Sequence, residues 1–231
     1  MKQRLALLID ADDTLWENNI YFEDAIAAFI RMLDHGRLNG REIRQVINRV
    51  EGECIVRHGY GLASFARALE NTCTAVQGTP PDEAQLRQIA AIASVITHHP
   101  MELLEGVEET LAWLHKRHRL IVVTKGNKAE QTDKFRRSGL ERFFEACVVL
   151  EEKDAAHYTE LLDRHALETS ATWMIGNSPK SDINQSMAAG LNAVYIPHSE
   201  TWVLEHEALR HPAEGRNLLH LQCFAELKNH F

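Results

Sequence analysis

The hydrophobic positions of this chain fall into three regions with different spacing. Residues 4–10 contain an unbroken apolar run from Leu5 to Ile9, a pattern typical of a parallel strand covered on both faces. Residues 21–99 place apolar side chains three and four positions apart, as on one face of a helix. From residue 100 onward, helical spacing alternates with short apolar runs, which predicts βαβ units and a parallel sheet.

The second region predicts four amphipathic helices. Their apolar faces consist of Phe22, Ala25, Ile26, Phe29, Ile30 and Leu33; Ile43, Val46, Ile47 and Val50; Leu62, Phe65, Ala66, Leu69 and Cys73; and Leu86, Ile89, Ala93 and Ile96. Breaks are expected at His35-Gly36, Gly59-Tyr60-Gly61 and Thr79-Pro-Pro81, with Asp82 as the N-cap of the fourth helix. This region shows no convincing strand pattern, so it is expected to be an all-α insert.

The third region predicts helices at 107–114, 128–138, 154–165 and 183–189, and strands at 120–124, 146–150, 173–175 and 193–196. After Ser199 the pattern indicates mixed helical segments, a short strand near Leu218 and a last helix. The expected fold class is α/β, with a mainly parallel sheet flanked by helices. Residues 1–15 and 100–231 would form this core, and residues 16–99 a small all-α domain.

Composition narrows the classes of function. The 231 residues carry a formal charge of −8 and a pI of about 5.9, which argues against a dedicated nucleic-acid binder. The four cysteines include no CxxC pair, so the sequence predicts neither a disulfide framework nor a compact zinc site. No apolar stretch approaches the ~20 residues that span a bilayer. A cytoplasmic protein with neither nucleic acid nor membrane as partner is expected, and monomer and homodimer stay open.

Polar residues follow the predicted strands at the points where these end. Asp10 follows the first strand, Thr124 ends the second, Lys153 follows the third, and the loop 176–182 follows the fourth. The carboxyl ends of parallel strands meet at one edge of a sheet, where open α/β sheets bind ligands. We therefore expect these residues to lie together.

Their residue types indicate phosphoryl chemistry. Asp10, Asp12 and Asp182 offer carboxylate oxygens, which suit Mg²⁺, and a cation would relieve their mutual repulsion. Asp10 is expected to attack phosphorus and form an aspartyl phosphate, while Asp12 acts as general acid and then as general base. Thr124, Lys153 and backbone N–H groups are expected to bind the phosphoryl oxygens.

Four motifs in this order resemble those of the haloacid dehalogenase superfamily. DxDx[TV] matches Leu8-Ile-Asp-Ala-Asp-Asp-Thr-Leu15, and a Thr that ends an apolar strand matches Ile121-Val-Val-Thr124. A Lys before a helix matches Glu151-Glu-Lys-Asp154, and GDxxxxD matches Gly176-Asn-Ser-Pro-Lys-Ser-Asp182. The resemblance covers nearly the whole chain. It implies a Rossmann-like core and, because the helical insert lies between the first two motifs, an α-helical cap.

The resemblance also implies roles for single residues. Asp10 would be the nucleophile and a metal ligand. Asp12 would be the general acid and base and would bind the metal through its main-chain carbonyl. Asp182 would be a third metal ligand, and Asn177 places an amide where relatives often have a carboxylate ligand. The phosphate-binding residues would be Asp12, Thr124, Lys125 and Lys153. The candidates for substrate recognition are Trp16, Asn18, Asn19, Arg57, His58 and Tyr60. The implied activity is Mg²⁺-dependent hydrolysis of a small phosphorylated metabolite.

Three alternatives remain within the same fold. Dehalogenases lack the second aspartate of the first motif, which Asp12 retains here. A mutase would pass the phosphoryl group to an acceptor other than water. A non-catalytic binding or regulatory protein is suggested only by Asn177. Phosphonate hydrolysis would need a lysine in the cap, and residues 21–99 contain none.

Overall fold

The computed structural model describes residues 4–33 and 38–231, so the break expected at His35-Gly36 lies outside the described residues. The chain divides into two compact units. The first combines Met1–Glu17 with Met101–Phe231, and the second is Asn18–Pro100. Each unit is described by itself.

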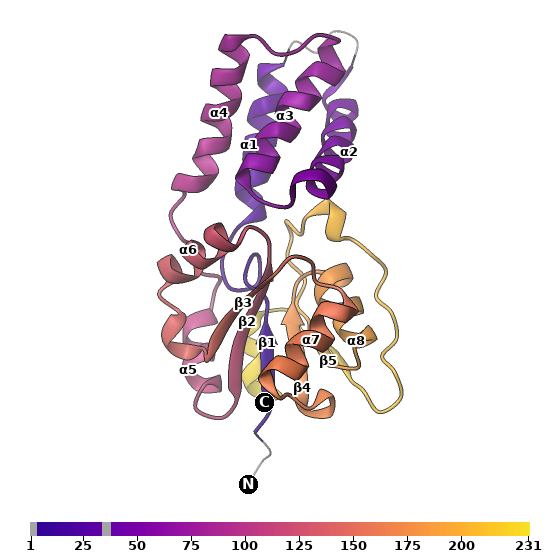
Figure 1. The fold of residues 1–231 in the computed structure, drawn as a ribbon. Coiled ribbons are helices and arrows are strands. Elements are labelled where there is room, and N and C mark those ends of the chain that lie inside the picture. Colours follow the sequence, from indigo (N-terminus) through magenta and orange to yellow (C-terminus); the bar gives the residue numbers. More distant parts are fainter. Residues whose placement is uncertain (1–3, 34–37) are drawn as a thin grey trace. The chain divides into compact units, whose positions relative to one another are not determined.

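The first unit is built on a parallel sheet whose order is β3-β2-β1-β4-β5-β6 (Figure 1). Its strands in the described part of the chain are β1 (Ala6–Ile9), β2 (Arg119–Lys125), β3 (Ala146–Leu150), β4 (Thr172–Gly176), β5 (Asn192–Tyr195) and β6 (Leu218–His220). The chain first builds outward from β1 through β2 to β3 and then returns to the other side of β1 with β4. This reversal of direction creates a switch point beside β1, where ligands bind in open α/β sheets.

Alternate side chains of the strands pack against opposite layers of helices. Leu7 and Ile9 belong to the same hydrophobic core as α5 (Val107–Leu114), α6 (Lys128–Ser138) and the C-terminal segment. Leu8 points the other way and packs with α7 (Ala155–His165). Both faces of β1 are therefore buried, which explains why its sequence is a continuous apolar run.

Local signals in the sequence set several boundaries correctly. The side chain of Asn127 accepts hydrogen bonds at the start of α6, and Gly139 ends that helix with a left-handed backbone. Asp154 caps α7 through the N–H of His157. The predicted α/β fold class and the strand near Leu218 are confirmed.

Two predicted segments differ in detail from the structure. The helix expected at 183–189 begins as a π-helical turn over Pro179–Asn184 and continues as the short helix α8 (Gln185–Ala188). The segment after Ser199 is largely irregular, with 3₁₀ turns at Val203–Glu205 and Phe224–Asn229 in place of regular helix. In both places contacts to other parts of the unit, rather than helical periodicity, hold the backbone.

The second unit contains α1 (Asn19–Met32), α2 (Gly40–His58), α3 (Leu62–Gln77) and α4 (Glu83–His98), and its described residues include no strand. Most of the apolar positions predicted from the sequence form its core, which includes Phe29, Ile47, Leu69 and Ile89. The prediction was wrong for Leu86, which lies in the first turn of α4 and is 39% exposed. Asp82 caps α4 as expected. Among residues 4–33 and 38–231, none of the helices combines the length and hydropathy of a membrane span.

Candidate active site

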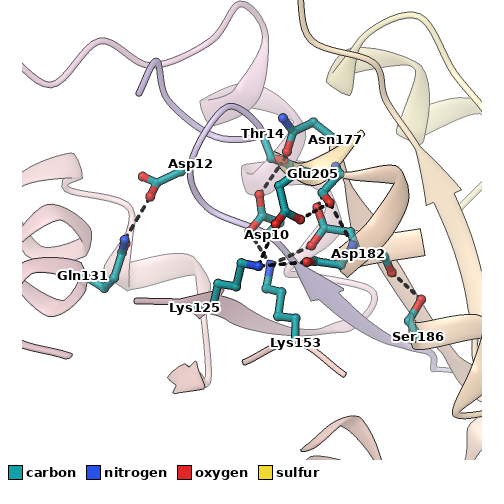
Figure 2. Close-up of polar contacts among 12 residues, drawn as sticks. Asp10, Asp12, Thr14, Lys125, Gln131, Lys153, Asn177, Asp182, Ser186 and Glu205 are labelled. Atoms are coloured by element: carbon teal, nitrogen blue, oxygen red, sulfur yellow. Dashed lines mark hydrogen bonds and ion pairs between the residues drawn. The ribbon is translucent and has the colours of Figure 1, made fainter. Parts of the chain in front are cut away.

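Three of the polar residues predicted to meet at one edge of the sheet do so, with Asp10 and Asp182 on either side of Lys153. The ammonium of Lys153 donates hydrogen bonds to Asp10 Oδ1 and, at 2.7 Å, to Asp182 Oδ1 (Figure 2). These side chains are 2%, 9% and 1% exposed, respectively, so little water reaches the cluster. Thr124 is buried at the end of β2. Strand ends far apart in the sequence thus form one charged, desolvated group.

Burial and mutual repulsion shape the electrostatics of this cluster. Burial and repulsion from Asp182 raise the pKa of Asp10 to about 7, although Lys153 acts in the opposite direction. Burial by itself would lower the pKa of Lys153, but Asp10 and Asp182 outweigh it and raise that pKa. Two buried carboxylates beside one ammonium leave a net negative charge, which a further cation would neutralise.

Gly176 allows Asp182 to reach this position. A Cβ atom on Gly176 would lie 2.3 Å from Asp182 Oδ2, far closer than any non-bonded contact. In the space that this glycine leaves, Asp182 Oδ2 accepts a hydrogen bond of 2.9 Å from the N–H of Ser178. The glycine of the fourth motif is therefore required by the packing of the carboxylate against the backbone.

Thr14 and Asn177 extend the cluster on the side of Asp10 away from Lys153. The hydroxyl of Thr14 donates to Asp10 Oδ2 at 2.9 Å and lies 3.4 Å from Asn177 Oδ1. The amide nitrogen of Asn177 donates to Thr201 Oγ1 at 3.2 Å, which turns its oxygen toward Thr14. The amide oxygen of Asn177 is thus near the carboxylates and available to a metal ion as a neutral ligand.

The side chain of Asp12 points away from Asp10 toward α6 (Figure 2). Lys134 Nζ lies 2.9 Å from both of its oxygens, and Gln131 and Trp16 donate hydrogen bonds of 2.9 and 2.8 Å. Burial would raise the pKa of Asp12, but Lys134 and the hydrogen bonds outweigh burial, so the pKa lies below its ordinary value. In this conformation Asp12 is an ionised carboxylate held by α6.

Lys125 lies among carboxylates and a hydroxyl. Its ammonium donates to Glu152 Oε1 at 2.9 Å, Ser181 Oγ at 2.9 Å and Glu205 Oε1 at 2.8 Å. Burial opposes ionisation of Glu205, but Lys125 together with hydrogen bonds from Ser178 and Ser181 outweighs it and lowers the pKa of Glu205. Glu205 comes from the 3₁₀ turn at Val203–Glu205, a segment without a recognisable motif.

A second group of titratable side chains consists of Asp13, Glu17 and His198. Their potential ligand atoms lie within 4.8 Å of one another. His198 Nε2 is 3.2 Å from Glu17 Oε2, and His198 Nδ1 is 3.9 Å from Asp13 Oδ1. The His198 ring thus lies between the carboxylates of Glu17 and Asp13.

The candidates for substrate recognition divide between the two units. Trp16 is buried in the core of the first unit and bonds to Asp12. Asn18 and Asn19 lie at the start of α1, and Asn19 is buried. In the same unit Arg57 and His58 are exposed at the end of α2, and Tyr60 follows in the turn. Trp16 therefore contacts a motif residue directly.

A family model described as haloacid dehalogenase-like hydrolase matches residues 7–196. The chain belongs to this family. The match spans all four motifs of the haloacid dehalogenase-like hydrolases and both units of the chain. A search of curated protein sequences gave no match.

Solved structures of haloacid dehalogenase-like proteins have the same fold. A family hydrolase from Xanthomonas campestris is 25% identical with a TM-score of 0.82, and the alignment covers 98% of this chain and 94% of that one. A predicted phosphoglycolate phosphatase from Haemophilus somnus is 15% identical, with a TM-score of 0.64 and coverage of 99% and 98%. L-2-haloacid dehalogenase from Xanthobacter autotrophicus is 16% identical, with a TM-score of 0.64 and coverage of 98% and 98%. These relatives include both chemistries, so the choice between them depends on the residues of the site.

Proposed function

We propose that this hydrolase is a Mg²⁺-dependent phosphatase that acts on a small phosphorylated metabolite through an aspartyl phosphate on Asp10. The observation that carries this proposal is the buried pair Asp10 and Asp182, which Lys153 bridges. A further carboxylate, Asp12, is the second aspartate of the first motif. A dehalogenase needs a nucleophilic carboxylate but no acid for the leaving group. Asp12 therefore favours phosphate esters, whose leaving oxygen requires a proton.

The donors of the site fit a hard divalent cation. Asp10, Asp182 and Asn177 would bind it through side-chain oxygens, and Asp12 through its main-chain carbonyl, an all-oxygen set that suits Mg²⁺. When bound, Mg²⁺ neutralises the carboxylates and polarises a phosphoryl oxygen. The pKa of about 7 for Asp10 supports this fit, because burial and then repulsion from Asp182 disfavour the charged carboxylate, which a bound cation would stabilise.

The reaction would proceed in two displacements. A carboxylate oxygen of Asp10 forms a bond to phosphorus while the ester P–O bond breaks, and the leaving oxygen takes a proton from Asp12. A water molecule then attacks the phosphorus of the aspartyl phosphate, gives its proton to Asp12, and releases inorganic phosphate and the Asp10 carboxylate. Lys153 and the Thr124 hydroxyl would bind the phosphoryl oxygens, where charge develops.

Asp12 must change conformation for this sequence. Its oxygens are bound to α6 and face away from Asp10 in the structure. A rotation about its side-chain bonds would exchange Lys134 for the substrate's leaving oxygen. Away from Lys134, the main cause of its lowered pKa is removed, so Asp12 can take up from solvent the proton that it gives to the leaving oxygen. The ion pair with Lys134 thus describes a resting state of the acid/base group.

A substrate screen tests the proposal. The protein is assayed against phosphorylated metabolites and against 2-haloacids, with Mg²⁺ and with a chelator, and Asp10→Asn serves as the inactive variant. Asp163→Asn, at an exposed position of α7, is the matched control. We expect Mg²⁺-dependent phosphate release that Asp10→Asn abolishes and Asp163→Asn preserves. Release of halide without phosphatase activity, or full activity of Asp10→Asn, would contradict the proposal.

A further inference from the structure

We propose that Lys125 and Glu205 are positioning residues that hold the loop 176–182 in the geometry that binds the divalent cation. The inference rests on the proposed function, because the cation is the one assigned to Asp10, Asn177 and Asp182. It changes the role of Lys125, which the sequence assigned to phosphate binding. It also gives a role to Glu205, which lies outside all four motifs.

The loop is attached to this pair at two points. Ser178 Oγ donates to Glu205 Oε2 at 2.5 Å, and Lys125 Nζ donates to Ser181 Oγ at 2.9 Å. Lys125 and Glu205 are themselves joined at 2.8 Å. The ion pair therefore connects the end of β2 and the C-terminal segment to the loop between them.

Each attached serine is the neighbour in sequence of a proposed metal ligand. Ser178 follows Asn177, and Ser181 precedes Asp182. A displacement of either serine would move the adjoining ligand with it. Because Mg²⁺ demands nearly ideal octahedral geometry, small shifts of two ligands weaken its binding.

The backbone of the loop needs such support. It forms a π-helical turn over Pro179–Asn184, a conformation that is rare and is found mostly at functional sites. Ser178 Oγ also accepts the N–H of Ser181 at 2.9 Å, so one hydroxyl closes the turn and binds Glu205. The side chains of Lys125 and Glu205 are 12% and 9% exposed, so their ion pair is weakly screened by solvent.

The contacts of Lys125 argue against a direct bond to phosphate. An ammonium group has three donors, and the structure gives Lys125 three acceptors in Glu152, Ser181 and Glu205. To bind a phosphoryl oxygen, Lys125 would have to release one of these partners. Lys153 differs, since its acceptors are the two carboxylates of the proposed reaction centre.

The test compares Mg²⁺ affinity across variants of the full chain. Lys125→Met and Glu205→Gln each remove one charge of the pair, and the double variant removes both. Ser178→Ala removes only a hydroxyl and decides the question if a charge variant does not fold. Lys116→Met and Glu214→Gln, at exposed positions of the same unit, are the matched controls. The dissociation constant of Mg²⁺ is measured by calorimetry, and kcat and KM are measured at saturating Mg²⁺.

We expect a rise of about 10-fold or more in the Mg²⁺ dissociation constant for each charge variant and a smaller rise for Ser178→Ala, as for other residues that orient metal ligands. The double variant should bind Mg²⁺ no more weakly than the single variant with the lower Mg²⁺ affinity, because the two residues act as one unit. Excess Mg²⁺ should restore most of kcat without a change in KM. Unchanged Mg²⁺ affinity in the folded variants, or a raised KM for Lys125→Met at normal Mg²⁺ affinity, would overturn this inference. A wild-type protein that binds no Mg²⁺ would instead contradict the proposed function.

Discussion

Replacing Lys134 by methionine tests how the protein controls the charge of Asp12. The substitution removes the ammonium that lies 2.9 Å from both carboxylate oxygens. An opposite charge at such a distance lowers the pKa of a carboxyl group by about 1–3 units. The side chains of Lys134 and Asp12 are 22% and 20% exposed, so water screens the pair in part. We therefore expect the pKa of Asp12 to rise in Lys134→Met.

This shift has a defined consequence for stability. The pKa of Asp12 in the folded protein lies below the ordinary value of 3.8, so ionisation of Asp12 stabilises the fold at pH values above 3.8. This stabilisation is lost as the pH falls through the pKa that Asp12 has in the folded protein. Hydrogen bonds to charged groups contribute about 1.5–3 kcal/mol, and screening by water reduces this contribution, so we expect Lys134→Met to lose about 1–2 kcal/mol of unfolding free energy at pH 7. At a pH below the folded pKa of Asp12, wild type and variant should have the same stability.

The assay is urea unfolding at neutral and at acidic pH, followed by tryptophan fluorescence. All four tryptophans of the chain lie within residues 1–17 and 101–231, so the signal reports the unit that contains Asp12. Lys116→Met, at an exposed position, is the matched control. A loss of stability that is equal at both pH values, or no greater at pH 7 than in the control, would refute the reasoning.

Three further predictions concern the metal site and the helical unit. Gly176→Ala should weaken Mg²⁺ binding by more than about 10-fold in calorimetry, because the added Cβ would displace Asp182. In the control Gly40→Ala the added Cβ makes an ordinary contact of 3.6 Å, and Mg²⁺ affinity should be unchanged. Without metal, the raised pKa of Asp10 makes its contribution to stability disappear as the pH rises through about 7. Mg²⁺ affinity should accordingly rise by about tenfold per pH unit below 7 and level off above it, and a flat profile would contradict this. Phe29→Ala should cost about 3–5 kcal/mol of unfolding free energy, measured by far-UV circular dichroism, because Phe29 is buried. The control Val56→Ala, at an 87% exposed position, should cost less than about 0.5 kcal/mol. Similar losses in the two variants would refute the assigned core.

The strands and helices were predictable where one local pattern dominated. The continuous apolar run before Asp10 could only be a doubly covered strand, and the Asn127 and Gly139 signals mark both ends of α6. The prediction failed at Pro179–Asn184, where Ser178, Glu205 and Lys125 hold a π-helical turn. Hydrophobic spacing carries no information about such contacts, because their partners lie far away in the chain.

The motif residues of the site were predictable for a related reason. Parallel strands bring their carboxyl ends to one edge, so Asp10, Lys153 and Asp182 were expected at the same edge of the sheet, and the strand order then placed them in contact. The directions of their neighbours were not predictable. Asp12 turns toward Lys134, and Lys125 toward Glu205, because rotamers depend on which charges the folded chain places within reach.

The sequence by itself determined the alternation of strands and helices, the all-α insert and the edge of the sheet at which the acidic residues meet. These follow from periodicity and chain direction, which are local properties. Only the tertiary structure decided that Asp182 packs against Gly176, that Asp12 rests on α6, and that Glu205 joins the site from the C-terminal segment. Each of these three features depends on contacts that form only when the chain folds back on itself. The free energy of a buried charge is set by those contacts and not by the residues next to it in the sequence.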